Sequence, residues 1–331
     1  MSENLVKWLL VGTGDIIRKR VAAALNSAPG GKVVAICGGR SRAAEIAAEH
    51  DIRTVYDDIE RALAESSADA AYVATPVHRH CDEGGQALAA SKHVLVEKPL
   101  GLSGDDATEL ATAAEKAGTV AGCAYYRRCF PRYGHLKRVI ESGELGRIVG
   151  VNMCNYSYFN PSKDDPKYWR VQKAASGGGP LADIGSHMFD MLIGLFGKPV
   201  STTAYCDTLV NDYEVEDTAS ILMILENGAH VTANFGWNTK TWRHEFEVVG
   251  SEGKVNWFPA DSGKVVKTVG REVEEIDLPN ADNVHEPLVE DFNMAINQGR
   301  PPIVPLIEAA KTNALMDAIY QSSQTGRKVK L

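Results

Sequence analysis

Two side chains that can exchange protons, Asp183 and His187, lie four positions apart in the segment 177–190. At 3.6 residues per helical turn this spacing puts both on one face of a helix, as an acid/base pair requires. Three glycines precede them and allow close approach of the backbone to a ligand, and Pro180 suits the first position of a helix. A histidine that is merely packed in an amphipathic helix is the competing interpretation.

A lysine, Lys98, follows the apolar run 94–96, which predicts a strand of a parallel sheet. Ligands of open α/β sheets bind beyond the carboxyl ends of such strands, so this position favours a functional role. An ammonium group there can hydrogen-bond a substrate hydroxyl and stabilise its oxyanion. Pro99 restricts Lys98 to extended geometry. Alternatively, Glu97 and Lys98 form an exposed loop pair, and the turn 75–76 is an ordinary end of the preceding strand.

The first apolar run ends in a turn with two glycines and continues into a helical pattern. The residues of this segment are Gly12, Thr13, Gly14, Asp15, Ile16 and Ile17. Two glycines permit a tight turn in which the pyrophosphate of a dinucleotide contacts backbone N–H groups at the helix N-terminus. Ile17 stands where the dinucleotide fingerprint has Gly or Ala. The pattern indicates a nucleotide-binding loop, and a simple strand-to-helix turn is the alternative.

The second strand is followed by Arg40, Ser41 and Arg42, with no acidic residue before Glu45. A site that prefers NAD places an acid here to hold the ribose hydroxyls, whereas an arginine accommodates the 2′-phosphate of NADP. We therefore expect NADP as the preferred cofactor, with NAD as the second choice. The alternative is that these residues form the solvated first turn of a helix, with Ser41 as its cap.

The pattern of apolar runs and helical segments along the chain changes near residue 124. Residues 1–124 alternate short apolar runs with helical segments, which predicts an α/β Rossmann domain with a doubly wound parallel sheet. Residues 125–331 predict an α+β domain with a large, open, mainly antiparallel sheet. We expect its strands at 148–158, 200–206, 219–225, 230–237, 245–249 and 254–257. The helical segment 285–323 is free to pack back on the first domain.

Composition narrows the class of protein. With 331 residues, 44% of them hydrophobic, and a net charge of -8, the chain suits two globular domains and disfavours a nucleic-acid partner. No apolar run approaches the ~18 residues of a membrane span, and no secretory signal is recognised. The six cysteines are dispersed and read as reduced thiols, without a structural zinc or other metal. We expect a cytoplasmic protein that has no membrane partner.

Four motifs together resemble the glucose-fructose oxidoreductase/inositol dehydrogenase/rhizopine catabolism family, abbreviated Gfo/Idh/MocA. They are Gly12-x-Gly14, Thr75-Pro76 with His80, Glu97-Lys98-Pro99 and the segment 177–190. Further agreement comes from 125–131, 143–148, 169–170 and 322–326. The resemblance implies a Rossmann domain joined to an open sheet that carries much of the substrate site and often the oligomer interface. It also implies a nicotinamide nucleotide and a sugar, sugar derivative or polyol, bound in a cleft between the domains.

The resemblance also implies roles for individual residues. Lys98 would contact the reacting oxygen, His187 would act as general acid/base, and Asp183 would position the substrate or His187, while Asp190 would be structural support. The cofactor would be bound by the glycine loop, by the arginine-rich turn, and by Thr75, Pro76, His80, Glu97, Lys98 and Pro99. The substrate would be bound by Lys98, Tyr126, Arg127, Trp169, Arg170, Asp183 and His187.

Three functions stay open at this point. The leading one is hydride transfer between NAD(P) and a secondary hydroxyl or ketone of a sugar or polyol. In the second, the nucleotide stays bound and is regenerated in each cycle of glycoside cleavage, elimination or sugar–sugar hydride exchange. The third is a nucleotide-sensing regulator without catalysis. We also expect a homo-oligomer, a dimer or tetramer, in which Ile221, Met223 and Leu225 face either a second subunit or helices of their own chain.

Overall fold

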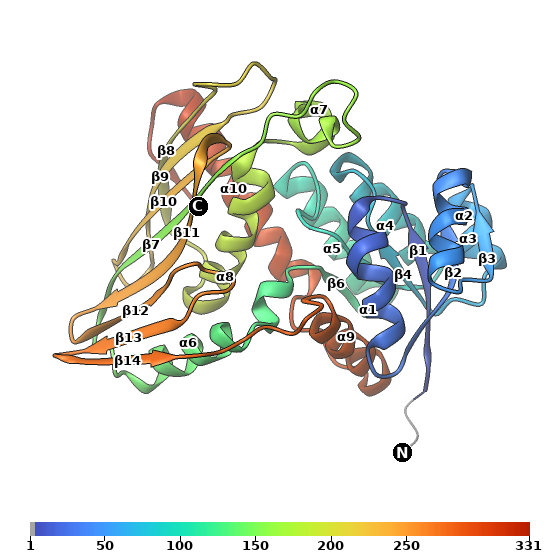
Figure 1. The fold of residues 1–331 in the computed structure, drawn as a ribbon, viewed down its shortest axis with the longest axis horizontal. Helices are drawn as coiled ribbons and strands as arrows, with labels where there is room; N and C mark the ends of the chain where they lie inside the picture. Colours follow the sequence, from blue (N-terminus) through green and yellow to red (C-terminus); the bar gives the residue numbers. More distant parts are fainter. Residues whose placement is uncertain (1–3) are drawn as a thin grey trace. The chain divides into compact units, whose positions relative to one another are not determined.

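Parallel strands form the first sheet (Figure 1). In the computed structural model, which describes residues 4–331, this sheet has six strands in the order β3-β2-β1-β4-β5-β6. The strands are β1 (Val6–Val11), β2 (Gly31–Cys37), β3 (Thr54–Tyr56), β4 (Ala70–Val73), β5 (His93–Val96) and β6 (Ala121–Cys123). All neighbouring pairs run parallel. The predicted doubly wound sheet is confirmed, and its strand order reverses between β1 and β4, where ligands of such sheets bind.

Helical segments connect these strands. They are η1 (Ile17–Val21), α1 (Ala22–Ser27), α2 (Arg40–Glu49), α3 (Ile59–Glu65), η2 (Val77–Arg79), α4 (His80–Ala89), α5 (Gly104–Ala117) and, after β6, η3 (Tyr126–Cys129). The boundaries of α5 follow from local chemistry. The Ser103 hydroxyl accepts a hydrogen bond from Asp106 N at its start, and Gly118, with φ of +66°, ends it.

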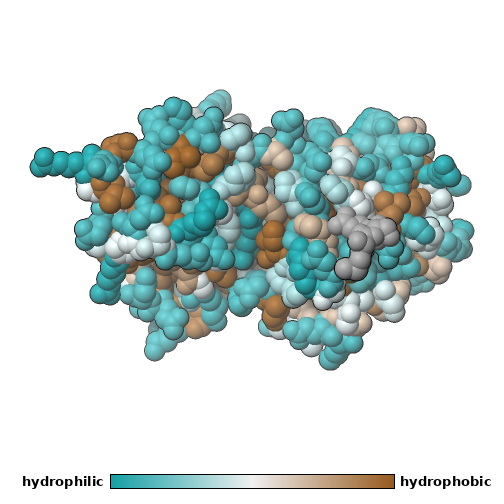
Figure 2. All heavy atoms as spheres, turned by 90° about the horizontal axis from the view of Figure 1, so that it is seen from below, coloured by the Kyte–Doolittle hydropathy of each residue, from teal (hydrophilic) through white to brown (hydrophobic). Residues whose placement is uncertain are grey.

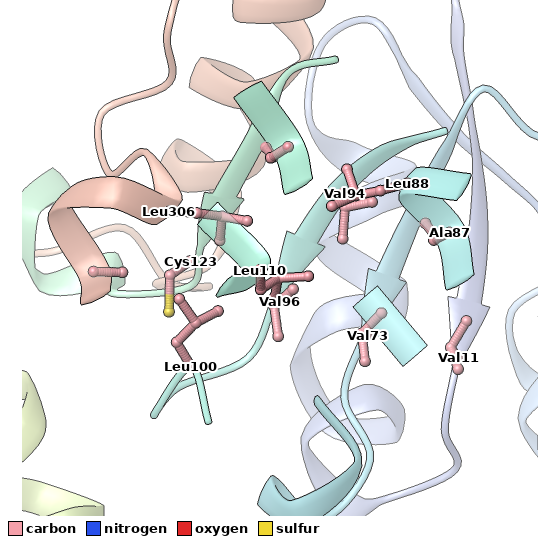
Figure 3. Packing of buried hydrophobic residues seen from close by; sticks show 14 of the residues in the cluster. Val11, Val73, Ala87, Leu88, Val94, Val96, Leu100, Leu110, Cys123 and Leu306 are labelled. Carbon is pink, nitrogen blue, oxygen red and sulfur yellow. The ribbon is translucent and has the colours of Figure 1, made fainter. Parts of the chain in front are cut away.

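Apolar side chains from the strands and helices build the core of this unit (Figure 3). On one face of the sheet, Val73 and Val96 pack with Leu110 of α5. On the other face, Trp8 packs against Phe292 of α9 (Glu286–Gln298), with ring centroids 5.4 Å apart. A helix from far along the chain thereby completes the first unit.

The chain divides into two compact units, and the division differs from the sequence boundary at 124/125. The first unit runs to Cys129 and includes Ala281–Ala310, whereas the second comprises Phe130–Asn280 and Lys311–Leu331. The physical reason is burial, because Tyr125 belongs to the core of the first unit and α9 covers Trp8. Residues 1–3 of the predicted first domain lie outside the described residues.

The second sheet has nine strands in the described chain, in the order β14-β13-β12-β11-β7-β10-β9-β8-β15. The strands are β7 (Ile148–Tyr158), β8 (Ser201–Asp207), β9 (Thr218–Ile224), β10 (His230–Gly236), β11 (Asn238–Gly250), β12 (Gly253–Trp257), β13 (Val265–Val269), β14 (Glu272–Ile276) and β15 (Val329–Lys330). Within this sheet, as far as the described residues 4–331 show it, β7 and β10 are the only neighbours that run parallel, and the other pairs are antiparallel. The expectation of a mainly antiparallel sheet is confirmed.

The two faces of this sheet differ in chemistry. On the inner face Ile221 and Met223 are buried, and Phe189 of α8 (Ser186–Phe196) meets Phe235 of β10 edge-on, with ring centroids 5.5 Å apart. On the outer face polar side chains hydrogen-bond from strand to strand, as Thr232 does with Asn152 at 2.6 Å. Ile221, Met223 and Leu225 therefore face the core of their own chain, and the homo-oligomer stays a prediction.

The second unit also contains helical segments, of which α8 and α10 (Leu306–Thr325) lie along one face of the sheet (Figure 1). The segments are α6 (Pro131–Ser142), η4 (Tyr168–Val171), α7 (Lys173–Ser176), η5 (Leu181–Gly185), α8 and α10, whose first turn belongs to the other unit. The hydroxyls of Ser322 and Ser323 on α10 accept hydrogen bonds from Ala204 N and Cys206 N of β8. This contact fixes α10 against the edge of the sheet.

The surface is mostly hydrophilic on the face that Figure 2 shows, with hydrophobic residues in separate small patches. None of the helices in residues 4–331 is long and apolar enough to cross a membrane. All six cysteines are free thiols, as the sequence predicts. Burial raises the pKa of the Cys37 thiol to about 11, so it stays protonated and poorly nucleophilic at neutral pH.

Candidate active site

The glycine turn after β1 has the geometry of a phosphate-binding loop. Gly12 has φ of +116°, and a Cβ atom there would lie 2.6 Å from the carbonyl oxygen of Ala74. The Gly12 N–H donates to Cys37 O at 2.8 Å, which ties the turn to the end of β2. Ile17 is fully buried, so the third fingerprint position holds a core side chain instead of a small residue. The turn and the following N–H groups fit a dinucleotide pyrophosphate.

The arginine-rich turn lies beside this loop. A Cβ atom on Gly38 would come within 2.6 Å of Thr13 Cγ2, so the two loops touch. Helix α2 begins at Arg40 with Gly39 at the N-cap and no side-chain cap, so Ser41 does not cap it. Arg40, Ser41 and Arg42 are exposed. Their side chains stay available as candidates for reading the nucleotide ribose.

His80 joins the two loops that follow β4 and β5. Its Nδ1 lies 2.9 Å from the carbonyl oxygen of Pro99, and its Nε2 lies 2.7 Å from that of Thr75. The ring is buried, and burial lowers the pKa of His80 below its usual range. The imidazole therefore acts inside the fold, where it holds the Thr75-Pro76 turn at a fixed distance from the Lys98-Pro99 turn.

Glu97 lies in the interior beneath the end of β5. Its carboxylate accepts hydrogen bonds from Tyr72 Oη at 2.8 Å and from Lys98 N at 3.1 Å, and it lies 3.4 Å from His285 Nε2. Burial alone raises the pKa of Glu97, but the contact with His285 and the charge of Lys98 outweigh that effect and lower it. The carboxylate thus fixes the backbone of Lys98 from inside the sheet.

The remaining predicted residues of the first unit lie near this strand end. The Lys98 side chain is partly exposed, and the ring of Tyr126 packs against that of His285, with centroids 4.8 Å apart. Arg127 is buried, with 4% of its surface exposed. His285 is completely buried and was not foreseen from the sequence, because it lies far from β5 along the chain.

Asp183 and His187 lie at the start of the helix formed by η5 and α8. Pro180 has helical angles, φ −60° and ψ −27°, and the next turn is widened so that Ser186 N donates to Leu181 O. The hydrogen bond here joins residues five apart, so this turn contains more residues than an α-helical turn. Residues four apart still lie nearly one turn from each other, and Asp183 and His187 therefore stay on one face. Such turns are rare and occur often at functional sites. The predicted helix start is confirmed.

Asp183 belongs to a cluster with two residues predicted to bind substrate. Arg170 Nη1 lies 3.4 Å from Asp183 Oδ2, and the Arg170 guanidinium lies over the ring of Trp169 at 5.7 Å. Trp169 is partly exposed, so it is not plain core. His187 is 3% exposed and Asp190 is completely buried, which suits a supporting role for Asp190. The second unit therefore presents a carboxylate, a guanidinium and an indole together.

A buried carboxylate that the sequence pattern does not reveal holds the start of this helix. Glu216 Oε1 accepts hydrogen bonds from Gly179 N at 3.0 Å, from Leu181 N at 3.1 Å and from Tyr320 Oη at 3.1 Å. A Cβ atom on Gly178 would lie 1.8 Å from Tyr320 Oη, and one on Gly179 would lie 2.0 Å from Glu216 O. The glycines thus have a packing role that their spacing did not suggest.

Within residues 4–331, no three His, Cys, Asp or Glu side chains are arranged to share a metal ion. The acid/base candidates and the glycine turn are groups that a nicotinamide-dependent oxidoreductase uses. The fold and these residues define a dinucleotide-binding enzyme class.

Comparison with known families agrees with this class. Residues 6–125 match the oxidoreductase family with an NAD-binding Rossmann fold, and residues 133–256 match the GFO/IDH/MocA C-terminal domain. The chain belongs to the Gfo/Idh/MocA oxidoreductase family, and it is an NAD(P)-dependent oxidoreductase of that family.

Individual relatives match along almost the whole chain. The 1,5-anhydro-D-fructose reductase of Ensifer adhaerens is 29% identical over 97% of this chain and 97% of its own. The D-xylose 1-dehydrogenase (NADP(+)) 2 of Haloferax volcanii is 28% identical over 97% and 98%. A structure of levoglucosan dehydrogenase with NADH and levoglucosan superposes with a TM-score of 0.90 at 21% identity, covering 99% of both chains. These distant relatives act on sugars.

Proposed function

We propose that this protein transfers a hydride between a nicotinamide nucleotide, preferably NADP, and a secondary hydroxyl or ketone of a sugar, sugar derivative or polyol. The proposal is carried by one observation: the chain combines side chains that can transfer protons with a glycine turn that has the geometry of a phosphate-binding loop. Lys98 lies two residues beyond the buried end of β5, and Asp183 and His187 share one helix face. A regulator that only senses a nucleotide has no need of such a set. The sugar-acting relatives support the substrate class.

The side chains divide the chemistry among themselves. A bound nicotinamide supplies the hydride donor or acceptor. In the oxidation direction we assign to His187 the removal of the hydroxyl proton and to Lys98 a hydrogen bond that stabilises developing negative charge. Asp183, held by Arg170, orients the substrate or His187, and the indole of Trp169 offers an apolar face to a sugar ring. In reduction the proton moves from His187 to the alkoxide.

Substitution of the two proton-handling residues tests this assignment. We expect Lys98→Ala and His187→Ala each to lower kcat by about 100-fold or more, with the Kd for NADPH within about threefold of wild type. Lys116→Ala and His230→Ala remove the same residue types from exposed positions and serve as matched controls that keep full activity. Full activity of either site variant would remove that residue from the proposed machinery.

A further inference from the structure

The phosphate loop and the arginine-rich turn meet at a charged corner. Asp15, the residue after the second glycine, places one carboxylate oxygen 3.5 Å from Arg42 Nη2 and the other 3.1 Å from Lys19 Nζ. The position is set by the backbone, because Gly38 packs on Thr13 and holds the two loops in contact. An acidic side chain therefore lies directly beside an arginine expected to read the nucleotide.

The charged side chains near the phosphate loop form two groups, one around Arg18 and one around Asp15. Arg18 pairs with Glu49 and lies 3.6 Å from Glu45, so the acids of α2 are engaged with the first helix. Arg42, by contrast, forms an ion pair with Asp15 of the phosphate loop. About half of the Arg42 side chain and 44% of the Asp15 side chain are exposed, so a ligand can reach both.

We propose that Asp15 is a specificity-determining residue that weakens the preference for a 2′-phosphorylated nucleotide by competing for Arg42. This inference rests on the nucleotide site of the proposed function and refines its choice between NADP and NAD. A 2′-phosphate at Arg42 must replace the carboxylate of Asp15 as the partner of the guanidinium. It must also approach that carboxylate, which repels it.

A nucleotide without the 2′-phosphate does not compete with Asp15 for Arg42. NADH places neutral ribose hydroxyls near Arg42, so the pair with Asp15 can persist while it is bound. Both nucleotides bring a pyrophosphate to the glycine turn, and repulsion between this group and Asp15 acts on both equally. Removing the charge of Asp15 therefore improves binding of both nucleotides, but it improves NADPH binding more.

Equilibrium binding of NADPH and NADH to the full chain tests this without a known substrate. We expect Asp15→Asn to raise the ratio of NADPH affinity to NADH affinity by roughly two- to fivefold, the range typical of exposed charge pairs. Because competition for Arg42 is lost when Arg42 is removed and only the direct repulsion by Asp15 remains, Asp15→Asn should raise the ratio less in an Arg42→Ala background than in the wild type. Glu45→Gln removes an equal charge that faces Arg18, so it serves as the matched control with a ratio near wild type.

The possible outcomes distinguish failure of this inference from failure of the proposed function. An unchanged or lowered ratio in Asp15→Asn would overturn the inference, since Asp15 would then be neutral or would orient Arg42 toward the phosphate. An equal rise with Glu45→Gln would also overturn it, because a general field and not the Arg42 pair would be responsible. If the wild type bound neither nucleotide, the proposed function itself would fail. Salt should reduce the Asp15→Asn effect, as expected for exposed charges.

Discussion

Two neighbouring carboxylates of the second unit, Glu216 and Asp217, have opposite electrostatic environments. Burial raises the pKa of Glu216, although hydrogen bonds from Gly179 N and Leu181 N oppose it. Burial also acts to raise the pKa of Asp217, but hydrogen bonds, first among them that from Leu209 N, outweigh it and lower the pKa. The ionised form is therefore costly at Glu216 and favourable at Asp217.

These environments predict different pH dependences for two isosteric variants. Because its folded pKa is raised, Glu216 loses stabilising effect as pH rises above its ordinary value of 4.5. We therefore expect the stability of Glu216→Gln relative to wild type to improve with pH above that value, by at most about 1.4 kcal/mol per pH unit. Chemical denaturation of both proteins at several pH values measures this difference.

Asp217→Asn provides the control for that experiment. The folded pKa of Asp217 is lowered from 3.8, so its contribution is already complete above that pH and is lost only as pH falls through the folded value. Its stability deficit should stay constant between about pH 5 and pH 8. A pH-independent deficit for Glu216→Gln as well would contradict the buried, destabilised carboxylate.

Which residues of the site could be predicted depended on how far apart their partners lie along the chain. Asp183 and His187 could be paired from the sequence because one helical turn joins them. Lys98 could be placed because it follows closely on an apolar strand. Glu216 could not be foreseen as the support of Gly179, 37 residues away, because only the folded sheet brings them together.

At the level of elements, the start of the η5–α8 helix depends on a glycine that has no room for a side chain. A Cβ atom at Gly179 would lie 2.0 Å from the backbone oxygen of Glu216, which cannot turn aside. We expect Gly179→Ala to destabilise the protein by about 3 kcal/mol and to lower activity by displacing Asp183 and His187. Thermal and denaturant unfolding measure the first effect.

A second glycine serves as the matched control. Gly85 lies inside α4, and a Cβ atom there would have no neighbouring atom within 4 Å, so Gly85→Ala should stabilise the protein by about 0.5–1 kcal/mol. If Gly179→Ala were as well tolerated as Gly85→Ala, the tight packing at the helix start would be disproved.

Some elements were visible in the sequence and others were not, for physical reasons. Strand β9 shows the alternation of buried and exposed residues that a half-buried strand requires. Strand β14, with the sequence EVEEI, has none of its residues fully buried, and β13 has only Val265 buried. Strand β14 at the sheet edge and β13 beside it are held by backbone pairing, which leaves no apolar pattern. The sequence therefore does not predict them.

At the level of the whole molecule, the sequence left open whether the helical segment 285–323 packs on the first domain. Helix α9 returns to the first unit, where Trp8 Nε1 donates to Asn293 Oδ1 at 3.0 Å. This hydrogen bond joins residues 285 positions apart. The amphipathic pattern of α9 predicts that it is a helix but does not say which sheet it covers. The division of the chain between the units thus depended on tertiary packing.

The central claim is that this protein transfers a hydride between a nicotinamide nucleotide and a sugar or polyol. The most direct measurement is nicotinamide absorbance of the purified protein with NADP or NAD and a panel of sugars and polyols. We predict oxidation of at least one of them, faster with NADP than with NAD, and slower by about 100-fold or more in His187→Ala. Binding of both nucleotides without turnover of any compound in either direction would contradict the claim.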